Sequence, residues 1–88
     1  MLYRIMSITD IHGNVIDTEP HRYMKGKVGY IFPGVFIQGN SFIFQYQDKA
    51  QEHFVKSSPV QEVVTEVESK PNVVKVHTMN SIYTLERI

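Results

Sequence analysis

The sequence predicts a small all-β domain in which five or six short strands curl into a barrel, with at most one helical turn. The chain has 11 Val, 9 Ile and 5 Thr, so 25 of its 88 residues are β-branched, and such side chains suit a pleated surface better than a helix. Ala occurs once and Leu twice, so the best apolar helix formers are almost absent. Short apolar stretches separated by Gly, Pro, Asn and Ser are also typical of an all-β protein.

The first third of the chain is predicted to hold two strands. Residues 2–8 alternate imperfectly between two faces, and residues 9–14 supply turn residues, with Asp and Asn bonding locally and Gly allowing a positive φ. A polar loop follows at 17–22. Residues 27–32 are expected to form the second strand, ended by Pro33-Gly34, which fits the second and third positions of a type II turn.

The middle third holds one clear strand. Residues 41–46 place Phe42, Phe44 and Tyr46 on one face. The preceding residues 35–37 stand between two turn signals and form either a short strand or a projecting loop. Residues 47–54 are the only stretch whose composition is compatible with a helix, and we expect at most one helical turn there. Ser57-Ser58-Pro59 would stop such a helix.

The last third alternates most regularly. Strands are predicted at 61–68, 73–78 and 81–87, with a turn at 69–72 and a tight hairpin across the two-residue gap at 79–80. Curling the sheet into a barrel buries its apolar face and shortens its edges. The predicted core consists of Tyr30, Phe32, Phe42, Phe44, Val63, Val67, Val74, Val76, Tyr83 and Leu85.

The length, charge and composition of the chain exclude several classes of protein function. Eighty-eight residues suit a single domain spanning 1–88, and nine basic against nine acidic side chains give no net charge, unlike a strongly cationic nucleic-acid binder. The absence of Cys removes disulfides, Cys-based zinc sites and thiol chemistry. Residues 1–10 lack the apolar region of a signal peptide, and the charge-free residues 28–47 are broken by Gly, Pro and polar side chains. We therefore expect a cytoplasmic protein without a membrane segment.

The order of these elements resembles that of SH3-like small barrels: a long polar loop after the first strand, a Gly-rich strand entry and a three-stranded finish. The ending, Ser58-Pro59-Val60 followed by residues 74–85, also resembles the tail of small uncharacterised bacterial and phage proteins. The resemblance covers mainly the last third of the chain and implies an SH3-like barrel. Peptide-binding SH3 domains carry an Ala-Leu-Tyr-Asp-Tyr-type motif and a groove Trp. The sequence has neither, so binding of Pro-rich ligands is not implied.

No pattern in the sequence indicates an enzyme, a metal site or a cofactor. The four histidines, at positions 12, 21, 53 and 77, are too far apart to give a close pair of ligands. Ser57 and Ser58 lie near His53, but no nucleophile motif surrounds them. The glutamates at 62, 66 and 68 alternate with Val and Thr, as on the wet face of a half-buried sheet.

Two binding functions remain. Both faces of the charge-free stretch are apolar, so one face is exposed unless something covers it. We expect Val35, Phe36 and Ile37 to bind a partner, either another protein or further copies of this chain in a dimer or higher oligomer. Of the three, Phe36 is the one expected to meet solvent or the partner. In the alternative arrangement the loop folds back and Phe36 closes one end of the barrel.

The other hypothesis is nucleic-acid binding. The segment Lys25-Gly26-Lys27-Val28-Gly29 resembles the Gly-containing basic strand entry of KOW-type barrels. There Arg22, Lys25 and Lys27 could face phosphates, with Tyr23 and Tyr30 stacking on bases. Alternatively, the two glycines only allow a bulge or tight bend. The zero net charge favours this structural interpretation over the nucleic-acid site.

Overall fold

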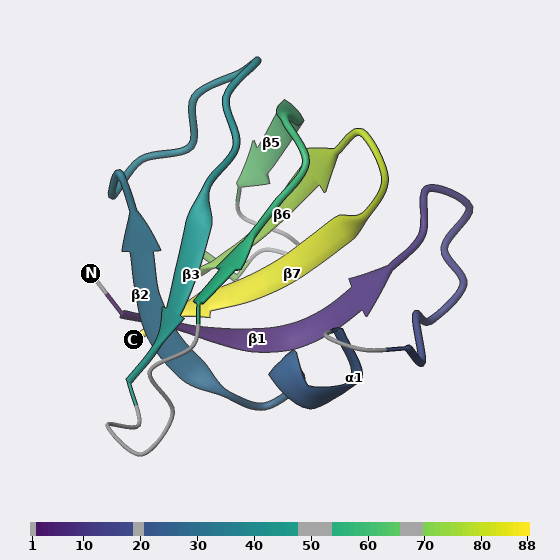
Figure 1. Ribbon diagram of the computed structural model, residues 1–88. Helices are drawn as coiled ribbons and strands as arrows, with labels where there is room; N and C mark the ends of the chain where they lie inside the picture. Colours follow the sequence, from purple (N-terminus) through teal and green to yellow (C-terminus); the bar gives the residue numbers. More distant parts are fainter. Residues whose placement is uncertain (1, 19–20, 48–53, 66–69) are drawn as a thin grey trace.

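The computed structural model describes residues 2–18, 21–47, 54–65 and 70–88. Within them the chain forms one antiparallel sheet of seven strands, in the order β4-β3-β2-β1-β7-β6-β5, and one short helix (Figure 1). The all-β prediction is confirmed, with more strands than the five or six expected. The elements are β1 Leu2–Thr9, α1 His21–Met24, β2 Val28–Phe32, β3 Ile43–Tyr46, β4 Phe54–Lys56, β5 Val60–Thr65, β6 Val73–Thr78 and β7 Ile82–Arg87.

The sheet curls around its core but is not a closed barrel. In the described residues no strand pairing joins the two edge strands, β4 and β5. Hydrogen bonds do join the start of β5 to the loop at residues 39–40. There the Gly39 amide donates to the Val60 carbonyl at 2.7 Å, and the Val60 amide donates to the Asn40 carbonyl at 2.9 Å. These bonds attach the start of β5 to the loop that precedes β3.

The imperfect alternation of the first strand comes from a bulge. In the pairing of β1 with β7, Ile5 lies opposite Leu85 and Ser7 lies opposite Thr84, so Met6 is an extra residue. A bulge changes the phase of the side chains along a strand. Ile5 and Ile8 therefore both point into the core, although they are three residues apart.

The turns after β1 and β6 form as their sequences predict. The Asp10 carboxylate accepts the amides of His12 and Asn14, each at 2.9 Å, which fixes the first turn. At the β6–β7 hairpin the Thr78 hydroxyl donates to the Ser81 carbonyl at 2.9 Å and accepts the Ser81 amide at 3.1 Å. Side chains of this type replace backbone partners in tight turns.

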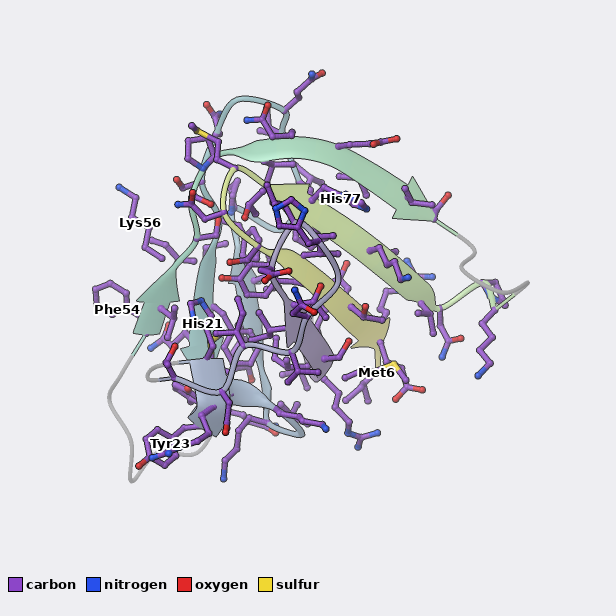
Figure 2. All side chains as sticks on the ribbon, turned by 90° about the vertical axis from the view of Figure 1, so that its right-hand side faces the viewer. Met6, His21, Tyr23, Phe54, Lys56 and His77 are labelled. Carbon is purple, nitrogen blue, oxygen red and sulfur yellow. The ribbon has the colours of Figure 1, made fainter. Side chains whose placement is uncertain are left out.

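The helical turn lies in a different place from the one predicted. It covers His21–Met24, at the end of the expected polar loop (Figure 2), and its Met24 side chain is fully buried. At the predicted site, residues 48–53 lie outside the described residues, and Phe54 begins β4. The helix forms where a tertiary contact of Met24 with the core supplies the stability that a single isolated turn lacks.

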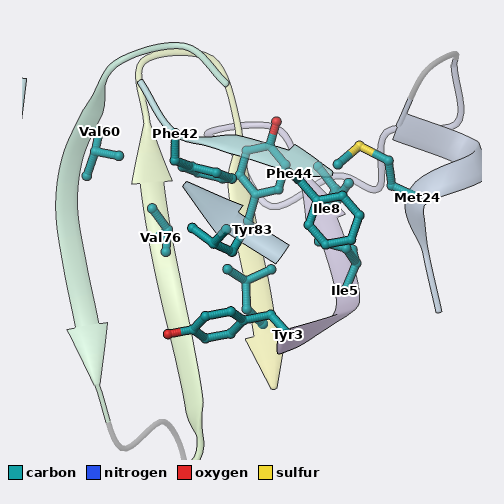
Figure 3. Packing of buried hydrophobic residues seen from close by; sticks show 11 residues of the cluster. Tyr3, Ile5, Ile8, Met24, Phe42, Phe44, Val60, Val76 and Tyr83 are labelled. Atoms are coloured by element: carbon teal, nitrogen blue, oxygen red, sulfur yellow. The ribbon is translucent and has the colours of Figure 1, made fainter. Parts of the chain in front are cut away.

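The core fills the concave side of the sheet (Figure 3), and five of the predicted members are buried in it: Phe42, Phe44, Val76, Tyr83 and Leu85. Val63 and Val74 are half-buried and pack against the core, and Val67 lies outside the described residues. An edge-to-face ring contact connects the two halves of the sheet. Phe42, directly before β3, lies 5.1 Å from Tyr83 of β7 between ring centroids.

Tyr30 and Phe32 were predicted to be buried, and this prediction is wrong. Their side chains are 40% and 48% exposed, because β2 turns its other face, Gly29 and Ile31, toward the core. A Cβ atom on Gly29 would lie 2.6 Å from a ring carbon of Phe44 and would meet the backbone oxygen of Gln45. Glycine therefore allows the Phe44 ring to pack on the β2 backbone, and this close packing fixes the phase of the strand.

Candidate interaction surface

The outer side of β2, β3 and β4 carries a largely apolar group of side chains. In the strand register Tyr30 pairs with Gln45, which pairs with Phe54. In the next row Phe32 pairs with Ile43, which pairs with Lys56. Directly opposed residues lie on the same face with Cβ atoms about 5 Å apart, so the two rows form one surface. With Leu2, which pairs with Tyr30, we call this surface the aromatic face: Leu2, Tyr30, Phe32, Ile43, Gln45, Phe54 and Lys56.

Its three rings are substantially exposed. Tyr30, Phe32 and Phe54 retain 40%, 48% and 62% of their accessible surface, which amounts to about 300 Å² for rings of this size. Figure 2 shows Phe54 and Lys56 projecting from β4 away from the body of the protein. Exposed apolar patches of about 300–600 Å² are the largest on ordinary monomers and are often functional.

The aromatic face is almost uncharged. Lys56 is its only charged side chain, and Gln45 supplies its amide group. The sequence hypothesis of an apolar second face is therefore supported in general but not in detail. On β2 the outward residues are Tyr30 and Phe32, which were expected in the core, whereas Ile31 is buried.

The loop at residues 35–37 is not a strand, and its middle residue turns inward. Phe36 packs edge-on against Tyr3 at 5.8 Å and against Phe42 at 5.3 Å between ring centroids. The expectation that Phe36 faces solvent is therefore wrong, because its ring covers the end of the core. Its neighbours Val35 and Ile37 point the other way and are 60% and 45% exposed. Partner binding by these three residues stays a prediction.

The proposed nucleic-acid residues are only partly brought together. Arg22, Tyr23, Lys25 and Lys27 are all exposed on or beside α1. The Arg22 guanidinium lies 5.1 Å from the centre of the Tyr23 ring and donates to its hydroxyl at 3.0 Å. Tyr30, in contrast, belongs to the aromatic face.

A cavity of about 190 Å³ lies between α1 and β1. His21 lines it, and burial holds the pKa of this imidazole below its usual value of 6.5. The His21 Nε2 atom lies 3.4 Å from the Tyr83 hydroxyl, whose own pKa is raised by burial. The cavity is smaller than the ~300–1,000 Å³ typical of ligand pockets. Its lining comes from separate segments, which is why the sequence did not reveal it: Ser7, Ile8, Val15, Ile16, Asp17, His21, Arg22 and Lys25.

The remaining predicted features are placed as follows. His12 lies in the exposed turn after β1, His77 lies on β6, and His53 is outside the described residues. Among the described residues, no three His, Asp or Glu side chains are grouped so that they could hold a metal ion. No helix within the same residues has the length and apolar character needed to span a membrane.

Comparison of the chain with protein-family models, with curated proteins and with solved structures found no match in any of the three. The resemblance to SH3-like barrels therefore stays a prediction. The candidate site rests on the geometry of the aromatic face.

Proposed function

We propose that this chain is a non-enzymatic, cytoplasmic interaction domain that associates with a second copy of itself through the half of the sheet that carries the aromatic face. The observation that supports the proposal is the exposure of Tyr30, Phe32 and Phe54 on one nearly uncharged surface. Fully burying an exposed Phe side chain is worth about 1.5–3 kcal/mol, and about half of each of these rings is still uncovered. Three neighbouring rings left in water would thus forgo a large part of the stability of a small domain.

A second copy suits this surface for two reasons. The chain has no net charge, so two copies do not repel each other strongly. A partner of strongly acidic or basic character would find only Lys56 to pair with on the aromatic face. The three rings expose about 300 Å², less than the ~800 Å² per partner of a stable interface. We therefore expect a weak dimer in which the rings form the apolar centre of the contact.

Light scattering coupled to size exclusion tests the proposal across a series of protein concentrations. The wild type should shift from monomer toward dimer as the concentration rises to high micromolar. Phe54→Glu should remain monomeric and folded, because Phe54 is 62% exposed. The matched control is Met6→Glu, an apolar side chain on β1 that is 39% exposed and lies outside the aromatic face. A wild type that stays monomeric at high micromolar concentration contradicts the proposal.

Nucleic-acid binding is the second candidate function, and the exposure of Arg22, Lys25 and Lys27 beside Tyr23 is the observation that favours it. Phosphate contacts by these cations should weaken steeply as the salt concentration rises, whereas apolar self-association should not. Fluorescence anisotropy with generic RNA and single-stranded DNA separates the two functions. Failure to bind at low salt would exclude this candidate.

A further inference from the structure

We draw no further inference here: the strongest candidate, the cavity of about 190 Å³ between α1 and β1 that His21 lines, has around it no buried side-chain polar atom without a hydrogen-bond partner among the described residues, so nothing in the structure shows what would bind there.

Discussion

The two halves of the sheet share one core but present different outer surfaces. On the outer side of β1, β7, β6 and β5 the side chains are mixed and mostly polar, and Arg4 pairs with Glu86 at 2.9 Å across β1 and β7. Lys75 and Glu62 continue this surface on β6 and β5. Among the described residues on the outer side of β2, β3 and β4, only Lys56 is charged, and three rings are exposed. One antiparallel sheet can thus have one half suited to water and another suited to a partner.

The largest expected effect on stability distinguishes the inner from the outer side of β2, β3 and β4, the strands that carry the aromatic face. Phe44→Ala should destabilise the protein by about 3–5 kcal/mol, because the Phe44 ring is fully buried and its loss leaves a cavity. With a total stability of about 5–10 kcal/mol, the variant should be close to unfolded at 37 °C.

Phe32→Ala is the matched control, since Phe32 lies on the neighbouring strand but is 48% exposed. It should lower the unfolding free energy much less. Chemical denaturation measures both variants. Equal losses of unfolding free energy in the two variants would show that the aromatic face belongs to the core. They would remove the distinction between the two halves of the sheet.

An intermediate effect on stability is expected in the loop at residues 35–37, which connects β2 to β3. Phe36→Glu should destabilise the fold by about 2–4 kcal/mol, because it places a carboxylate against the rings of Tyr3 and Phe42. Val35→Glu changes an adjacent side chain that is 60% exposed and should leave the melting temperature almost unchanged.

Thermal melts and light scattering on this second pair of variants sharpen the comparison. A folded Phe36→Glu monomer would show that the ring serves an interface and not the core. A loss of association in Val35→Glu, without loss of stability, would extend the interaction surface from the aromatic face to this loop.

Most strands were predictable because their signals are local. Alternation with a period of two placed Phe44 of β3 inward together with Phe42, which directly precedes that strand. It likewise placed Tyr83 and Leu85 of β7 inward. Turn residues such as Asp10 then fixed the ends of these segments.

The errors fall where a distant contact decides the conformation. On β2 the alternation favours the face with Tyr30 and Phe32, but the packing of the Phe44 ring on Gly29 reverses it. This reversal creates the aromatic face, so the candidate site could be predicted only as an apolar second face, without its residues. The helix at His21–Met24 likewise depends on the burial of Met24, a tertiary contact with no periodic signal in four residues.

The smallest expected effect concerns the connection between the halves, where α1 joins β1 to β2. Burial lowers the pKa of His21 from 6.5 in the folded protein, so the unfolded chain binds this proton more readily than the folded chain does. The resulting contribution to stability is present above about pH 6.5 and is lost as the pH falls through the lower pKa of the folded state. The melting temperature should therefore decrease between about pH 7.5 and 5.5, above the range where carboxylates titrate. His21→Gln should weaken this dependence, although Asp17, Arg22 and Lys25 line the same cavity and Tyr83 contacts the ring in both proteins. A variant with the same pH dependence as the wild type would show that protonation of His21 is not coupled to folding.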